Sequence, residues 1–348
     1  MAHKVYIRKI TGDWIKPKDI SNALDWLEWH EIVPKDARVF IKPNLTWPEH
    51  LPGVTTTPKA IESVVIALLE RTSNIYIGES DGGYHSYKAE EAFELHGLYE
   101  LEKKFGISIF NLSKDEAVTN VLEIDGKTIT VTLPNILLNE IDVFITMPVP
   151  KVHVMTQVSL AFKNQWGCIP STMRLREHYD FDRKIIAINK LIKPKLVIFD
   201  GTYFLNDAGP MSGTPVRMDT LLMGNDPGAT SAVALEIMGI SPNKVRHLQL
   251  AAKVGVFPQS GLDNIFLNTE LDNYKTQKFV MKRALLDWIS LIGFRSSFFT
   301  HLFWDSWLAG PLHKLLFYLR KNSAIQQILY GDPGAPPEWR EYEKDQLS

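Results

Sequence analysis

The chain has 348 residues, of which 45% are hydrophobic and 22% charged, and this composition excludes disorder as its main state. Lysine and arginine total 38 against 40 aspartate and glutamate residues, so a general nucleic-acid binder is not expected. The single cysteine, Cys168, excludes an intramolecular disulfide framework and a cysteine-ligated iron–sulfur cluster, and it favours the cytoplasm.

Strands and helices are predicted to alternate over the first two thirds of the chain. Short apolar runs predict strands at 39–41, 75–77, 141–147 and 196–199, and helical periodicity predicts helices over 59–70, 88–104 and 229–238. Alternating polarity around Asp125-Gly126 predicts a hairpin over 121–133. This order predicts an α/β fold with mainly parallel sheets flanked by helices, in two lobes at 1–145 and 146–275.

Polar residues follow several of the predicted strands. Because ligands gather at the carboxyl ends of parallel strands, these residues predict one concave site for a small anionic molecule. Glycines let the backbone approach a ligand, and successive N–H groups can hold an anion, although a tight turn would use the same residues. The candidate anion-binding residues are Lys42, Asn44, Gly78, Glu79, Ser80, Gly82, Gly83, Lys151, Asn164, Gly209 and Gly213.

The segment from 150 to 180 is the densest in reactive side chains. It holds His153, Lys163 and His178, and a neutral imidazole can take a proton or bind a metal. Lys163 stands among apolar residues, where a desolvated amine has a lowered pKa and can act as a nucleophile or covalent anchor. The alternative is a surface lysine and two histidines that bond to the backbone.

The last part of the chain, 276–348, changes in composition and predicts amphipathic helices rich in aromatic residues. We expect no secretory signal at the N-terminus. We also expect no membrane span, because charged residues interrupt the apolar run between Phe279 and Tyr318. Three roles stay open for this extension: packing on its own core, a contact between copies of the chain, or a peripheral membrane contact through 279–320.

Six separated blocks resemble the family known as domain of unknown function 362. They include IKPN at 41–44, GESDGG at 78–83, PKVHVMTQVSLAFKNQWGCIP at 150–170, AGPMSG at 208–213 and NDPGATSAVALEIMG at 225–239. The resemblance covers about residues 38 to 255 and leaves the aromatic extension outside. Where the family usually has two acidic residues, this chain has Asn206 and Ser231, so a metal-binding role of those loops is in doubt.

A more distant resemblance concerns the order His153, Lys163, Gly167, Pro170 and His178, which is similar to the active-site segment of nickel-pincer lactate racemases. That resemblance implies that Lys163 anchors a pyridinium-derived nickel cofactor, that His178 binds the metal and that His153 moves protons.

His85 is then a match to the second catalytic histidine, and Asp200 is a further candidate metal ligand. These resemblances imply an enzyme, dependent on a divalent metal or a nickel-pincer nucleotide, that moves a proton or hydride on a small carboxylate or phosphorylated substrate, as racemases and epimerases do. The alternative is a non-catalytic ligand-binding or scaffold subunit that acts through its aromatic C-terminal helices.

Overall fold

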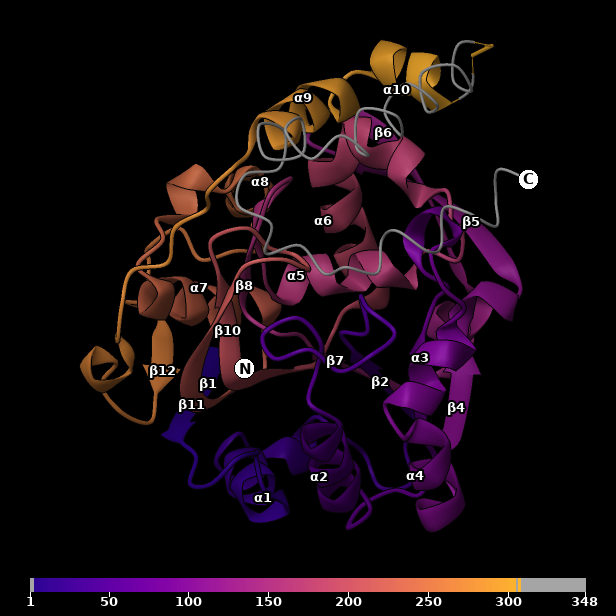
Figure 1. Cartoon of the computed structure of the whole chain (residues 1–348). Coiled ribbons are helices and arrows are strands. Elements are labelled where there is room, and N and C mark those ends of the chain that lie inside the picture. The colour runs from indigo at the N-terminus through magenta and orange to yellow at the C-terminus, as the bar shows by residue number, and fades with distance from the viewer. Residues whose placement is uncertain (1–2, 305, 308–348) are drawn as a thin grey trace.

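The computed structural model describes residues 3–304 and 306–307. In this part of the chain, ten strands form one sheet with helices on both faces (Figure 1). Along the sheet the order is β12-β1-β11-β10-β7-β2-β3-β4, with β8 beside β10 and β9 beside β8. The strands are β1 (His3–Lys9), β2 (Val39–Pro43), β3 (Ile75–Glu79), β4 (Ser108–Asn111), β7 (Val143–Met147), β8 (Lys151–His153), β9 (Gln157–Ser159), β10 (Leu196–Asn206), β11 (Thr214–Gly224) and β12 (Ile265–Leu267).

The predicted fold class, α/β with a mainly parallel sheet, is confirmed. Strands β10, β7, β2, β3 and β4 run in one direction, while β11 runs antiparallel to β10 and β1. The carboxyl ends of β2, β3 and β7 therefore lie at the same edge, where parallel sheets place their ligands.

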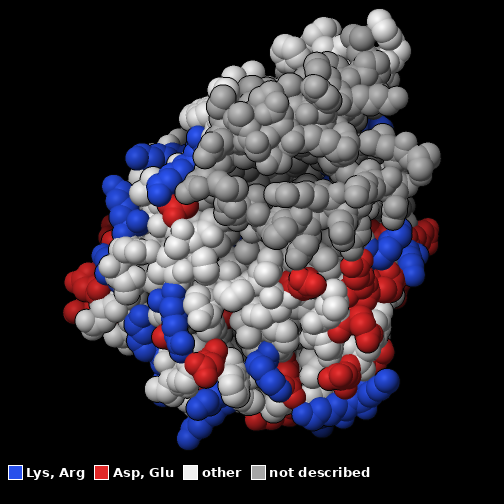
Figure 2. Space-filling view, viewed as in Figure 1, with Lys and Arg blue, Asp and Glu red and all other residues white. Residues whose placement is uncertain are grey.

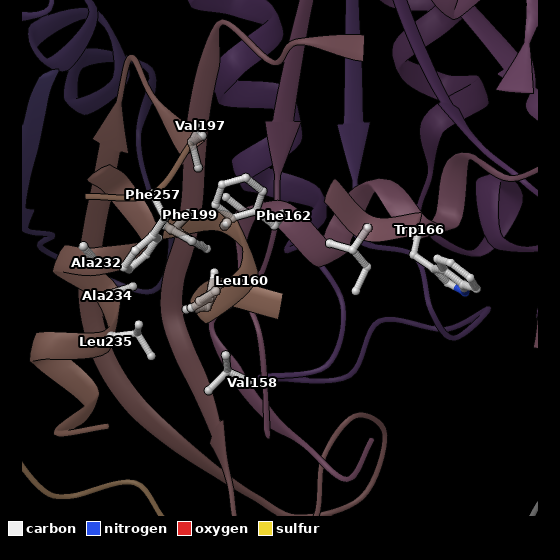
Figure 3. Close-up of a cluster of buried hydrophobic side chains, with 14 of the residues drawn as sticks. Val158, Leu160, Phe162, Trp166, Val197, Phe199, Ala232, Ala234, Leu235 and Phe257 are labelled. Atoms are coloured by element: carbon white, nitrogen blue, oxygen red, sulfur yellow. The ribbon is translucent and has the colours of Figure 1, made fainter. Parts of the chain in front are cut away.

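Helices form one layer on each face of the sheet. One layer holds α1 (Pro17–Trp26), α2 (Pro58–Leu68), α3 (Ala89–Leu95) and α4 (Leu98–Phe105), and the other holds α5 (Ala161–Asn164), α6 (Phe181–Ile192), α7 (Pro227–Met238) and α8 (Arg246–Lys253). Because successive side chains of a strand point to opposite faces, Val39 and Ile41 of β2 enter the first core and Phe40 enters the second. Figure 3 shows the second core, where Phe199 of β10 lies near Leu235 of α7.

The predicted hairpin is confirmed as strands β5 (Ala117–Ile124) and β6 (Lys127–Pro134). Asp125 and Gly126 form its turn with φ angles of 53° and 69°, which are the positive values that a tight two-residue hairpin turn requires. The hairpin lies against α6.

The single helix predicted over 88–104 is wrong, because the structure divides it into α3 and α4. The break is at Gly97, which has a φ of +67° and so occupies the left-handed region that glycine tolerates. Apolar periodicity continues across the break, which explains why the pattern alone suggested one helix.

The boundary expected between residues 145 and 146 falls within β7. This strand lies between β2 and β10, and β1 from the N-terminal region lies between β11 and β12. Strands from both sides of the boundary thus share one sheet, and the two halves of the chain supply helices to opposite faces.

The C-terminal extension is helical where it is described, with α9 (Leu285–Phe294) and α10 (Ser297–Trp304). Residues 305 and 308–348 lie outside the described part, so the segments expected at 276–348 and 279–320 are seen only up to 307. Among the described helices, none combines the length and apolar character that crossing a membrane requires. On the face in Figure 2, charges of both signs are interspersed, and the visible described atoms form no extended basic surface.

Candidate active site

A buried ion pair joins the ends of β2 and β3. Lys42 Nζ lies 2.5 Å from Glu79 Oε2, and the two residues are only 1% and 5% exposed. Lys42 also donates to the carbonyl of Pro43, and the Glu79 carboxylate accepts from the backbone N–H groups of Leu45 and Ser80. Such a pair needs these additional hydrogen bonds, because burial of two charges is costly without them. The structure therefore gives Lys42 and Glu79 a fixed geometry at the predicted edge of the sheet.

Gly167 lies directly against this ion pair. A Cβ atom built at Gly167 would stand 2.5 Å from Glu79 Oε1 and 3.0 Å from Lys42 Nζ, so no larger residue fits without displacing the pair. Ser80 Oγ donates to the carbonyl of Gly167 at 2.6 Å. The segment from 150 to 180 is thereby fixed on the loop that follows β3.

Three backbone N–H groups of the loop after β3 already have hydrogen-bond acceptors within the protein. Ser80, Asp81 and Gly82 donate to Glu79 Oε1, Ser113 Oγ and the carbonyl of Tyr87, respectively. Gly78 is required by packing, since its Cβ would stand 2.4 Å from the carbonyl of Phe110. The loop thus reaches the site through the side chain of Glu79, whereas the sequence suggested its backbone.

Lys151 is buried on β8, and its Nζ donates to the carbonyl of Val54 at 2.6 Å. The loss of water around it, together with the positive charges of Lys163 and Lys42, holds the pKa of this amine well below its ordinary value of 10.5. A lysine in this state carries its charge at a high energetic cost, so the site favours the arrival of a negative group.

Lys163 lies on α5 with its Nζ 5.6 Å from the centre of the Phe181 ring. Within the described residues, no carboxylate or carbonyl accepts from this amine. Desolvation by the surrounding protein, reinforced by the charges of Arg174 and Lys42, lowers the pKa of Lys163 to about 7. The amine is therefore partly neutral at physiological pH, as the apolar neighbours in the sequence predicted.

Three buried imidazoles surround this lysine closely enough for their pKa values to respond to its charge. His153 on β8 accepts from the backbone N–H of Met155 through Nδ1 at 3.1 Å, so its neutral ring carries the proton on Nε2. Desolvation and the charge of Lys163 hold the pKa of His153 well below 6.5 and lower that of His178 to about 3. Both rings are neutral at physiological pH.

His178 lies in the 3-10 helix η6 (Arg174–Asp180), where its ring stacks on Trp166 at 5.4 Å between centroids. Its Nδ1 is buried without a hydrogen-bond partner in the described part of the chain. Such an orphaned nitrogen is expensive in a folded protein unless a ligand or water completes it.

His247 on α8 is the third imidazole, and sequence reasoning missed it. The residue is 0% exposed, and neither ring nitrogen has a partner among the described residues. Burial and the charge of Lys163 lower the pKa of His247 to about 3. No motif marks this position, because a histidine in an amphipathic helix gives no sign of what the helix packs against.

Arg174 is a second residue that the sequence did not suggest. Both terminal nitrogens of its guanidinium group donate to the carbonyl of Asp81 at 3.0 Å. The group has no carboxylate bonded to it in the described structure, and its positive charge contributes to the low pKa of Lys163.

A cavity of about 150 Å³ lies beside His178. Its wall combines aromatic and charged side chains, namely Met155, His178, Tyr179, Phe181, Asp182, Arg246 and Arg295. Arg246 Nε lies 3.4 Å from Asp182 Oδ2, and the Phe294 ring from the C-terminal extension meets His178 edge to face. The cavity thus combines aromatic side chains, two guanidinium groups and one carboxylate.

Other predicted residues lie apart from this cluster. His85 is exposed and contacts Thr172 Oγ1 at 3.1 Å. Gly209 packs on β8, where its Cβ would meet the carbonyl of Val152 at 1.9 Å, and Gly213 forms a turn with a φ of +129°. These glycines serve the packing of the chain.

The two amides also have structural partners. Asn164 Nδ2 donates to the carbonyl of Lys42 and to Thr146 Oγ1, and Asn44 Oδ1 accepts from the backbone N–H of Thr46. Asn164 therefore ties α5 to β2 and β7. The side chain of Asn44 makes a local bond within the loop after β2.

The two candidate metal ligands do not share a site. The Asp200 carboxylate accepts from the N–H of Thr57 at 2.6 Å and from the Thr202 hydroxyl at 2.8 Å, whereas His178 is surrounded by aromatic rings. Among the described residues, no three histidine, cysteine, aspartate or glutamate side chains converge on a point that could hold a metal.

A cofactor attached to the protein would make different demands. The partnerless amine of Lys163 and the orphaned Nδ1 of His178 fit the anchor and ligand roles that the racemase resemblance implies. Cys168 is buried, and burial raises its pKa, which is typical of an unreactive thiol.

Comparison with known proteins shows the family of the chain. A sequence model of the family described as "Domain of unknown function (DUF362)" matches residues 39–236. A thylakoid-associated protein of Synechocystis sp. is 24% identical over 235 residues, which cover 64% of this chain and 69% of that protein.

Similar solved structures include the lactate racemase apoprotein from Thermoanaerobacterium thermosaccharolyticum, with a TM-score of 0.44, 14% identity and coverage of 68% of this chain and 57% of that one. A protein from Thermotoga maritima gives a TM-score of 0.40 and 14% identity, with coverage of 70% and 60%. The chain thus spans less than two thirds of either solved protein, and both resemblances expected from the sequence are found.

Proposed function

The chain belongs to the family described as domain of unknown function 362, and we propose that it is an enzyme that moves a proton at a carbon atom next to a carboxylate group. The observation that carries this proposal is the cluster of His153, His178 and His247 around the partnerless amine of Lys163. His178 and His247 have buried ring nitrogens without a partner in the described residues, which destabilises a fold, so a role in chemistry explains them better than a role in packing.

A small carboxylate suits the charges of the site. Lys42, Lys151 and Arg174 supply positive charge near Lys163, and Glu79 balances part of it. A bound carboxylate would add a negative charge and so raise the lowered pKa values of the histidines toward the physiological range, where acid–base catalysis is efficient.

The imidazoles can divide acid and base roles. His153 carries its proton on Nε2 and can donate it, while His178 has a buried Nδ1 with no donor bonded to it and can accept one. Inversion at a carbon atom requires a proton donor and a proton acceptor on opposite faces of that carbon, and we propose that His153 on β8 and His178 on η6 take these two places.

Lys163 and His178 would hold a nickel-pincer nucleotide if this chain takes one, and that group would then serve as a hydride acceptor. The protein's own contribution stays the same: the positive side chains bind the carboxylate, and the aromatic walls formed by Trp166 and Phe181 exclude water. The geometry does not favour the alternative of a non-catalytic scaffold subunit, because it gives the unpartnered groups no use.

The proposal is tested by hydrogen exchange. In D₂O, the full chain as purified should replace the C–H hydrogen next to the carboxylate of a small hydroxy or amino acid such as L-lactate or L-alanine, followed by NMR. His153→Gln should slow this exchange about 100-fold or more, the usual share of a general acid. The exposed His30→Gln is the matched control. Absence of exchange with every small carboxylate, or full activity in His153→Gln, would reject the proposal.

We also propose that α9 and α10 hold the chain at a membrane surface. Leu285, Trp288 and Ile292 lie three and four residues apart on one side of α9 and are 53%, 50% and 65% exposed. Phe298 on α10 and Trp307 after it are also exposed, at 68% and 84%. Exposed aromatic and aliphatic side chains on consecutive short helices suit the interfacial region of a bilayer, and the similar protein from Synechocystis sp. is named thylakoid-associated.

A further inference from the structure

We propose that the amine of Lys163 forms an imine with the carbonyl carbon of a small 2-oxo carboxylate. This inference rests on the proposed function, because it names a substrate class for the same site. It differs from that function in predicting a covalent bond that can be trapped and located.

The first step concerns which lysine is able to react. Lys42 and Lys184 each lie 2.5 Å from a carboxylate oxygen, and Lys151 donates to a backbone carbonyl. Lys163 has only the face of Phe181 against its Nζ in the described structure. Its pKa of about 7 leaves a substantial neutral fraction at pH 7, and the lone pair of a neutral amine is what attacks a carbonyl.

The second step concerns the substrate. The neighbouring cavity of about 150 Å³ is lined by Phe181, the ring that Lys163 covers, and by three charged residues. Arg246 pairs with the Asp182 carboxylate, so the guanidinium group of Arg295 gives the cavity its excess positive charge. A cavity of roughly this volume holds a molecule of about six heavy atoms, such as benzene. Guanidinium groups favour carboxylates, so a short molecule with a carbonyl next to a carboxylate matches both the volume and the charge.

The third step is the chemistry, which needs no oxidant or reductant. The Nζ lone pair of Lys163 adds to the carbonyl carbon, and one Nζ proton passes to the carbonyl oxygen to give a neutral carbinolamine. The hydroxyl group takes a proton from solvent and leaves as water, while the Nζ lone pair forms the C=N bond and nitrogen keeps its last proton. His153, with a proton on Nε2, can stabilise the oxygen by a hydrogen bond as it leaves. A protonated imine withdraws electrons from the adjacent carbon and so assists the proton removal proposed above.

The test is reductive trapping on the full chain as purified. The chain is treated with glyoxylate or pyruvate in the presence of cyanoborohydride, and the reduced adduct is located by intact mass and peptide mapping. We expect one adduct, on Lys163. Pyruvate should form this adduct at a concentration at least tenfold lower than acetone needs, because acetone lacks the carboxylate. Lys163→Arg should abolish the adduct, and Lys190→Arg on α6 should keep it.

Three results would overturn the imine: adducts spread evenly over surface lysines, no adduct on Lys163 in the wild-type chain, or a covalent group already present on Lys163 before treatment. Mapping of the wild-type chain decides these outcomes even if a variant fails to fold. If the adduct is trapped but no deuterium is exchanged, the imine is supported and the proposed function is rejected. If deuterium is exchanged but no adduct is trapped, the proposed function is supported and the imine is rejected.

Discussion

Three lysines of this site are buried in three different ways. Lys42 has a carboxylate partner, Lys151 has a single backbone carbonyl, and Lys163 has an aromatic face. Burial, reinforced by the charge of Lys42, lowers the pKa values of Lys151 and Lys163, and the charge of Lys163 adds to this effect at Lys151. A fold gains nothing from such repulsion, so the arrangement points to a negatively charged ligand.

Replacing His247 by leucine should make the protein less sensitive to acid. The folded-state pKa of His247, about 3, is lower than the ordinary value of 6.5, so below pH 6.5 the unfolded chain takes up a proton that the folded chain does not. The free energy of unfolding then falls as pH falls, by about 1.4 kcal/mol per pH unit, or about 2 kcal/mol between pH 6.5 and pH 5.

In His247→Leu, the part of the decrease in unfolding free energy that comes from His247 should disappear. Urea unfolding at pH 7 and pH 5 measures this decrease. The exposed His30→Leu is the control and should leave the difference between the two pH values unchanged. An unchanged pH dependence in His247→Leu would show that the ring is hydrated or partnered in solution.

The sequence was informative about some residues of the site and silent about others. His153, Lys163 and His178 could be found because they stand in one segment among apolar residues, and the structure groups them around one amine. The use of the N–H groups of Ser80 and Asp81 could not be foreseen, because their acceptors include Ser113, which lies far along the chain. The same holds for His247, whose surroundings depend on tertiary packing.

The apolar surface of α9 predicts binding to lipid vesicles. Leu285→Glu together with Ile292→Glu should lower co-sedimentation of the full chain with vesicles that contain anionic lipid by about fivefold or more, since burial of apolar area drives interfacial binding. Val121→Glu on β5 changes an equally exposed apolar residue elsewhere and should have no effect. If the double variant instead lowers the apparent mass in size-exclusion chromatography and leaves vesicle binding unchanged, this surface binds a second copy of the chain.

Elements were predicted well where local pattern and tertiary structure agree. The apolar runs at 39–41 and 75–77 became β2 and β3, and turn chemistry at Asp125-Gly126 gave the correct hairpin. Helix length was overestimated at Gly97, because periodicity does not reveal where the backbone adopts a positive φ. The pairing of β1 with β11 and β12 joins residues that are more than 200 positions apart, and no local pattern encodes it.

At the scale of the whole molecule, the C-terminal extension is attached to the site. Met281 forms a bridge with Asp207, and Lys282 Nζ lies 2.7 Å from Asp207 Oδ1. Arg283 donates to the carbonyl of Val154 at 2.8 Å and to Gln157 Oε1 at 3.1 Å. Because Phe294 then contacts His178 and Arg295 lines the cavity, the extension completes a wall that the sheet and its helices leave open.

Arg283→Ala should therefore loosen the extension while the sheet stays folded. The change removes both hydrogen bonds and the contact of the guanidinium group with the Trp288 ring, at 5.2 Å, which together hold α9 on the segment after β8. Hydrogen bonds from a charged group contribute about 1.5–3 kcal/mol, so the open form should become about tenfold or more populated. Limited proteolysis should then cleave between 283 and 297 correspondingly faster and leave a stable fragment that ends within this range. Lys282→Ala, which removes an exposed ion pair, should change the cleavage rate much less. Equal rates in the two variants would mean that α9 is held by its apolar contacts, and the wall of the cavity would then be independent of Arg283.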